Sequence, residues 1–170
     1  MAYEIRALVC EPPLAATTAE LLGAQAQPLT EGLHIVPLPR DGTIVPRAES
    51  SDGDPMLLLT ADVEAVATEV SRRGRIAYIE AEFFGGLGVQ ASVVWDGGAV
   101  VHGPLLREYP GENPSQPGVD PINTALEALG VAPTGADAFD TVGLGRHRTT
   151  EEWREHASGA GSSPAPGARP

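Results

Sequence analysis

Two glutamates in one predicted strand are the first residues whose spacing suggests chemistry. Glu80 and Glu82 alternate with apolar residues in IAYIEAEFF, so they share one strand face at about 7 Å separation. Gln90 on the following strand is expected on the same polar face. Paired carboxylates can transfer protons or bind a hard cation, whereas on a solvated sheet they are ordinary surface residues. Both interpretations stay open, and we assign neither a catalytic residue nor a metal site.

One basic cluster, Arg146, His147 and Arg148, follows glycines at positions 143 and 145. Arginine binds carboxylates and phosphates through paired N–H donors, so this cluster could recognise an anionic group. Alternatively, it ties its segment to the acidic face of the sheet through ion pairs. The residues predicted to contact a partner or ligand are therefore Glu80, Glu82, Gln90, Arg146, His147 and Arg148.

The remaining motifs favour structural roles. Gly85-Gly86-Leu87-Gly88 resembles a phosphate-binding loop, but it lies between predicted strands and lacks a following helix to supply amides. His34, His102 and His156 show no metal-ligand spacing, and His102 is expected to be partly buried. The single Cys10 excludes an internal disulfide and a multi-cysteine zinc site. Because no lysine occurs, a Walker-A loop and a Schiff base are excluded, and we predict no cofactor.

The formal net charge of −12 limits the partners of the chain. It argues against binding to nucleic acid or to an anionic membrane surface, and it suits either solubility or a basic protein partner. No run of about 18 apolar residues predicts a membrane span, and the first residues lack a signal-peptide pattern. We therefore expect a cytoplasmic protein. Abundant Ala, Gly, Pro and Arg without Lys are typical of a GC-rich bacterial genome.

Residues 75–103 must position these side chains, and they predict three strands joined by glycine turns. Apolar residues at 77, 79, 81 and 83 predict one buried face, and those at 91, 93 and 95 continue it on the next strand. The second turn is either Gly97-Gly98 or Asp96-Gly97, and both registers place His102 on the apolar face, whereas a three-residue loop would place it on the other face.

The other segments complete an α+β domain over residues 1–156. Strands are expected at 3–9 and 33–38, with a short edge piece at 42–45, and helices at 18–25 and 61–73. Further helices should begin after N-caps at Asp120, Asp137 and Thr149. We predict a mostly antiparallel sheet of about five to six strands, with helices packed on one face. Residues 104–121 read as a Pro-rich loop, and the Gly/Ser/Ala/Pro-rich tail at 157–170 as disordered.

Three segments carry a resemblance to known proteins: IEAEFFGGLGVQASVVW, PINTALEALGV and FDTVGLGRHRTTEEW. Together they resemble a family of small, largely uncharacterised bacterial proteins that share FFGGxGxQ-like and GLGRHR-like motifs. Some small acidic proteins of this shape are similar to immunity proteins, which neutralise a toxin encoded beside them. The resemblance therefore implies a protein partner, and it transfers no catalytic residue.

Three functions follow as expectations. The first is a non-enzymatic, possibly immunity-like protein that binds the basic face of a partner through its acidic surface and the loop at 104–121. The second is a small hydrolase or transferase that uses Glu80, Glu82 and His102, with His147 as a further candidate. The third is a module that binds an anionic ligand between the Gly85–Gln90 loop and Arg146–Arg148. The sequence leaves the oligomeric state open.

Overall fold

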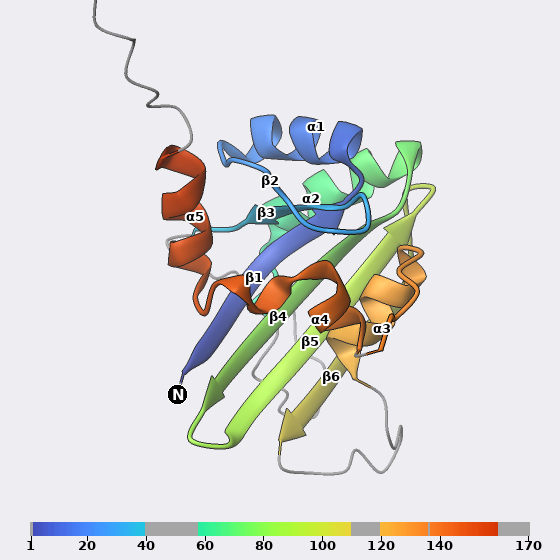
Figure 1. Cartoon of the computed structure of the whole chain (residues 1–170). Coiled ribbons are helices and arrows are strands. Elements are labelled where there is room, and N and C mark those ends of the chain that lie inside the picture. The colour runs from blue at the N-terminus through green and yellow to red at the C-terminus, as the bar shows by residue number, and fades with distance from the viewer. Residues whose placement is uncertain (1, 40–57, 110–119, 136, 160–170) are drawn as a thin grey trace, which may run out of the picture.

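A computed structural model describes residues 2–39, 58–109, 120–135 and 137–159. Within these ranges six strands form one antiparallel sheet in the order β2-β3-β1-β4-β5-β6 (Figure 1). The fold confirms the predicted α+β class and the predicted sheet of five to six strands. The strands are β1 (Tyr3–Cys10), β2 (Gln27–Pro28), β3 (His34–Pro37), β4 (Ile76–Phe84), β5 (Leu87–Asp96) and β6 (Ala99–Tyr109).

Five α-helices accompany the sheet within the described ranges, and most begin at predicted signals. Asp120 and Asp137 accept hydrogen bonds from backbone amides three residues later, and Thr149 does the same for Glu152. The first helix differs, because it begins at Pro12, where proline suits the first turn, and not at Thr18. The helices are α1 (Pro12–Leu22), α2 (Ala61–Val70), α3 (Pro121–Ala128), α4 (Ala138–Val142) and α5 (Thr150–Gly159), with 3-10 turns η1 (Ser71–Arg73) and η2 (Leu144–Arg146).

The helices cover both faces of the sheet, so the expectation of one covered face is wrong (Figure 1). We call the two sides the α1–α2 face and the α3–α5 face, after the helices that pack there. Each face has its own hydrophobic core, centred on Tyr78 and Trp95 for α1–α2 and on Ile79 and Trp153 for α3–α5. Both faces of the central strands β1 and β4 are therefore buried, and alternation along β4 separates two cores.

The first hairpin turn sets a register that differs from the expected one. Gly85 and Gly86 form a two-residue loop with φ values of 61° and 85°, which glycine adopts without strain. Glu80 consequently pairs with Ala91, and Gln90 pairs with Ala81. Gln90 therefore points to the α3–α5 face, opposite to Glu80. The predicted shared polar face is wrong because a shift of one residue moves every side chain to the other side.

The second turn is Gly97-Gly98, one of the two predicted loops, yet His102 is not buried. Trp95 pairs with Val100, but Val94 pairs with His102, so a bulge at Val101 interrupts the ladder. This end of β6 is an exposed edge strand, and His102 is exposed with it. The predicted partly buried histidine is thus a surface residue.

The chain continues as strand β6 through Pro104 to Tyr109, where the sequence suggested the start of a loop. A proline is tolerated because β6 lies at the edge of the sheet. The rest of that predicted loop, at 110–119, lies outside the described residues, as do the edge piece at 42–45 and the tail from 160. Residues 157–159 belong to α5.

The segment before α5 completes the edge of β1 where β3 ends. The Arg148 carbonyl accepts a hydrogen bond from the Glu4 amide at 2.8 Å, and the Thr150 hydroxyl accepts one from the Arg6 amide at 2.9 Å. These contacts anchor residues 148–150 beside the first strand, although about 140 residues separate them in sequence. They place Arg148 near the amino-terminal end of β1.

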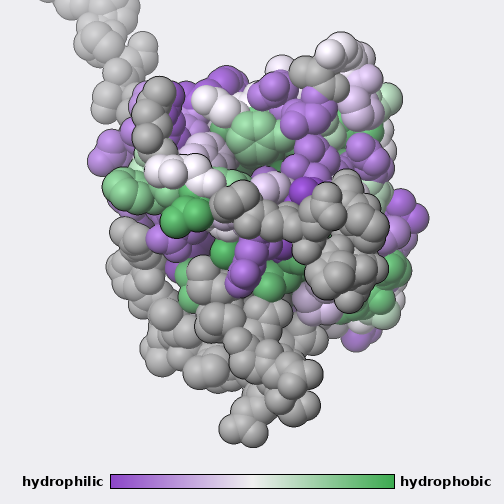
Figure 2. All heavy atoms as spheres, turned by 90° about the horizontal axis from the view of Figure 1, so that it is seen from below, coloured by the Kyte–Doolittle hydropathy of each residue, from purple (hydrophilic) through white to green (hydrophobic). Residues whose placement is uncertain are grey.

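The turn between β4 and β5 carries exposed apolar side chains. Phe84 and Leu87 pair across the last rung and are 76% and 65% exposed. Figure 2 views the molecule from the end at which this hairpin projects in Figure 1, and hydrophobic and hydrophilic side chains lie intermixed there. Among the described helices, none is long and apolar enough to cross a membrane.

Candidate functional site

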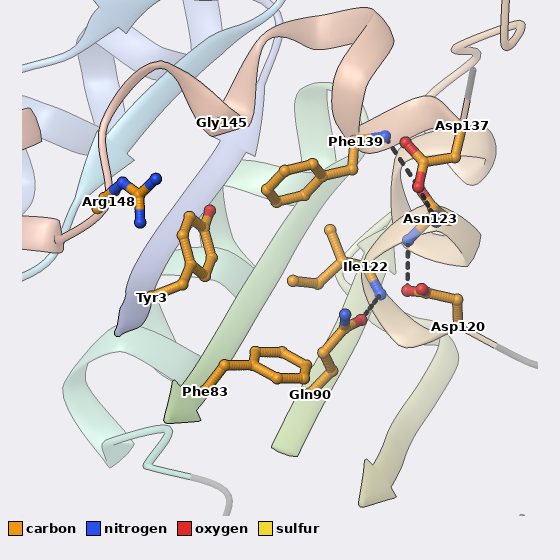
Figure 3. Close-up of a pocket in the computed structure, with 10 residues that line it drawn as sticks. All are labelled: Tyr3, Phe83, Gln90, Asp120, Ile122, Asn123, Asp137, Phe139, Gly145 and Arg148. Atoms are coloured by element: carbon orange, nitrogen blue, oxygen red, sulfur yellow. Dashed lines mark hydrogen bonds between the residues drawn. The ribbon is translucent and has the colours of Figure 1, made fainter. Parts of the chain in front are cut away.

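A pocket of about 360 Å³ opens on the α3–α5 face, at the end of the sheet where β1 begins and β4 ends. Aromatic rings and several polar groups border it in Figure 3. Its volume lies in the range of small-molecule sites, roughly 300–1,000 Å³. The lining residues are Tyr3, Phe83, Gln90, Asp120, Ile122, Asn123, Asp137, Phe139, Gly145 and Arg148.

Strand β5 fixes the start of α3 at the edge of this pocket. The Gln90 side-chain oxygen accepts a hydrogen bond from the Ile122 amide at 3.4 Å. The Ser92 hydroxyl donates to the Pro121 carbonyl at 2.6 Å, and Ser92 is buried. In Figure 3 the nitrogen of the Gln90 amide points toward the pocket, between Phe83 and Ile122. Gln90 can therefore donate hydrogen bonds to a molecule in the pocket.

Two carboxylates that cap helices lie on one side of the pocket. Asp120 accepts the Asn123 amide at 3.3 Å, and Asp137 accepts the Asp140 amide at 2.9 Å. Asn123 links them, since its side-chain nitrogen donates to Asp137 at 3.2 Å and its oxygen accepts the Phe139 amide at 2.8 Å. A carboxylate has about four acceptor positions, so both can accept further donors.

Aromatic rings form the apolar walls. Tyr3 contacts Phe139 edge-on, with ring centroids 5.5 Å apart, and Phe83 lies 5.3 Å from the ring of Tyr109. The Tyr3 hydroxyl is buried and has no hydrogen-bond partner within the described part of the chain. Burial raises the pKa of Tyr3, which keeps the phenol protonated and able to donate.

The predicted basic cluster is divided by the structure. Arg148 lines the pocket, whereas Arg146 lies over the ring of Trp153 at 5.1 Å and donates to the Pro28 carbonyl at 2.6 Å. The His147 ring packs against Trp153 and His156, with centroid distances of 4.5 and 4.2 Å. Burial, and then the neighbouring His156, lower the pKa of His147. Arg146 and His147 therefore hold the segment that presents Arg148.

Glu80 and Glu82 lie on the other face of the sheet. Glu80 is 6% exposed and accepts hydrogen bonds from the Tyr78 hydroxyl at 2.7 Å and the Leu58 amide at 2.8 Å. Burial raises the pKa of Glu80 despite these two donors, which lower it. Glu82 is exposed. The interpretation of both as surface residues is therefore wrong for Glu80.

The three side chains of the expected acid/base site do not converge. His102 pairs with Val94, whose side chain belongs to the α3–α5 core, while Glu80 and Glu82 belong to the α1–α2 face. In the part of the chain that the structure describes, no group of three or more His, Cys, Asp or Glu side chains could hold a metal ion.

The pocket joins side chains from the three segments on which the expected resemblance is based. Phe83 and Gln90 come from the first segment, Asn123 from the second, and Phe139 and Arg148 from the third. Compared with known protein families, curated proteins and solved structures, the chain matches none. The convergence of distant segments is therefore the main guide to the site.

Sequence reasoning identified only two of the lining side chains, Gln90 and Arg148, as contact residues. The sequence correctly predicted that Asp120 and Asp137 cap helices. It did not predict that the two residues lie beside the same pocket. Tyr3 gave no signal beyond strand alternation, because its position at the pocket depends on pairing between β1 and β4.

Proposed function

We propose that the protein binds a small organic anion in this pocket. The observation that supports this most is the placement of Gln90 and Arg148, two predicted contact residues far apart in sequence, on the same aromatic-walled cavity. The arginine fork and the amide nitrogen both suit a carboxylate. The Phe83 and Phe139 rings suit an apolar, flat body attached to it.

The net charge of the chain indicates which kind of anion the pocket would bind. A net charge of −12 repels anions at long range, so a simple ion such as phosphate gains little from the protein as a whole. An aromatic carboxylate gains from burial of its ring as well, at about 25 cal/mol per Å² of apolar surface removed from water. The pocket therefore favours an aromatic carboxylate over an inorganic anion.

Thermal unfolding with increasing benzoate tests the proposal. A ligand that binds only the folded state stabilises it by about 2.7 kcal/mol at a concentration 100 times its Kd, so the melting temperature should rise with dose. Arg148→Gln should weaken binding about tenfold or more. Arg154→Gln is a matched control, because Arg154 pairs with Glu151 on α5 and is not among the pocket-lining residues. If benzoate gives no dose-dependent rise, or if both variants respond equally, the proposal fails.

A protein partner is a second candidate function, favoured by the exposed hairpin turn. Phe84 and Leu87 form an apolar pair in an otherwise acidic chain, and exposed apolar patches often mark contact surfaces. A partner with an apolar pocket and a basic rim would complement them, as the immunity-like expectation implies. The product of a neighbouring gene is the protein to co-purify at low salt. Phe84→Ser with Leu87→Ser should abolish retention, and Leu21→Ser, at a site 56% exposed on α1, should not.

A further inference from the structure

The geometry points to a bipolar ligand: an aromatic molecule with a carboxylate at one end and a protonated amine at the other. This inference deepens the proposed function and rests on it. Arg148 and the Tyr3 hydroxyl lie on one side of the pocket in Figure 3, and Asp120, Asn123 and Asp137 lie on the opposite side. The side chains of Phe83, Ile122 and Phe139 lie between the two polar sides.

The acidic side selects for a cation. Asp120 and Asp137 accept hydrogen bonds from backbone and side-chain amides, the Tyr109 hydroxyl also lies beside Asp120, and neither carboxylate forms an ion pair within the described residues. A ligand that carried only negative charge would meet two like charges at this end, which is a cost that opposes binding. An ammonium group instead converts the spare acceptor positions into charge-assisted hydrogen bonds, which are about twice as strong as neutral ones.

The opposite side selects for a carboxylate. Arg148 lines this side of the pocket, and its guanidinium is a planar fork of N–H donors that matches a carboxylate. The Tyr3 hydroxyl adds a donor that is buried and without a partner among the described residues, and leaving such a group unsatisfied costs about 1–3 kcal/mol. A ligand oxygen that accepts from this hydroxyl would remove that cost. The ring of Tyr3 continues the aromatic wall toward Phe139, at 5.5 Å.

Three probes built on the same benzene ring separate the contribution of the carboxylate from that of the amine. 4-(Aminomethyl)benzoate carries both charges, benzoate carries only the anion, and benzylamine carries only the cation. We expect 4-(aminomethyl)benzoate to bind at least about tenfold more tightly than either fragment, equivalent to about 1.4 kcal/mol, when Kd is measured by calorimetry.

Single substitutions assign each end of the probe. Arg148→Gln should weaken 4-(aminomethyl)benzoate and benzoate but leave benzylamine unchanged. Asp137→Asn should weaken 4-(aminomethyl)benzoate and benzylamine but leave benzoate unchanged or tighter. Asparagine is as good an N-cap as aspartate, so α4 should keep its start. If Asp137→Asn unfolds the protein, Asp120→Asn is a second variant of the same kind. Tyr3→Phe should weaken the binding of benzoate and 4-(aminomethyl)benzoate but not that of benzylamine.

The outcomes separate this inference from the proposed function. If benzoate binds as tightly as 4-(aminomethyl)benzoate and Asp137→Asn changes neither, the ligand is a simple anion and the bipolar inference is overturned. If none of the three probes binds the folded protein, the proposed function fails as well. If benzylamine alone binds, the acidic side is the whole site, and both statements are overturned.

Discussion

Deleting one hydroxyl, in Tyr78→Phe, tests the burial of Glu80 without disturbing the core. Tyr78 is fully buried, and its hydroxyl donates to Glu80 at 2.7 Å. Phenylalanine keeps the ring and its packing beside Trp95 in the α1–α2 core. The substitution therefore removes the hydrogen bond to the buried carboxylate, together with the contact of the same hydroxyl with Arg6.

The expected loss depends on the charge of Glu80. A hydrogen bond to a charged group contributes about 1.5–3 kcal/mol, and one between neutral groups about 1 kcal/mol. Because burial raises the pKa of Glu80, the folded state holds its proton to higher pH than the unfolded state does. Ionisation of Glu80 therefore lowers the free energy of unfolding as the pH rises from the pKa of Glu80 in the unfolded state through its pKa in the folded state. Since the Tyr78 hydroxyl opposes this effect, its removal should be more costly at about pH 8 than at about pH 4.5.

Urea unfolding of both proteins at these two pH values measures the effect. The free energy of unfolding of Tyr78→Phe should fall by about 2 kcal/mol at the higher pH and by about 1 kcal/mol at the lower. In a Glu80→Gln background the same substitution should cost about 1 kcal/mol at both. An equal loss at both pH values in the wild-type background would show that Glu80 carries the same charge at both, and the reasoning would be refuted.

Three further predictions concern stability and reactivity. Gly103→Ala should destabilise the protein by about 3 kcal/mol or more in urea, because a Cβ there would lie 2.7 Å from the Ser92 carbonyl and φ is 87°. Gly97→Ala has open space around it and should cost only about 1–2 kcal/mol. Burial raises the pKa of the Cys10 thiol to about 12, so iodoacetamide should label it only after unfolding, and rapid labelling of the native protein would contradict this. Thr149→Ala should cost about 1 kcal/mol through the lost cap of α5, whereas a change of less than about 0.3 kcal/mol would show that the cap is dispensable.

Local signals in the sequence predicted much of the fold. The Gly97-Gly98 turn, the N-caps at Asp120 and Asp137 and the helix over 61–73 all appear at their expected places, whereas the first hairpin has a regular two-residue turn in place of the expected bulged loop. Each depends on residues within a few positions of one another, so the sequence contains the whole cause.

Burial on both faces could not be predicted in the same way. Polar residues at positions 80 and 82 looked like one solvated face, but Glu80 is enclosed by contacts from Tyr78 and from the amide of Leu58, 22 residues away. The same limit applies to the pocket. Tyr3 and Arg148 meet there only because residues 148–150 complete the edge of β1.

The difference between the two sets of carboxylates supports placing the proposed ligand site on the α3–α5 face. The Oε2 atom of Glu80 already accepts both a hydroxyl and an amide, in a site that is closed to water. Asp120 and Asp137 accept bonds that set the starts of their helices, yet they border an open pocket and keep acceptor positions. A carboxylate that is enclosed together with its donors, as Glu80 is, has no surface to offer a ligand. One that is fixed in place with capacity to spare is preorganised for a ligand, because binding then costs little reordering of the protein.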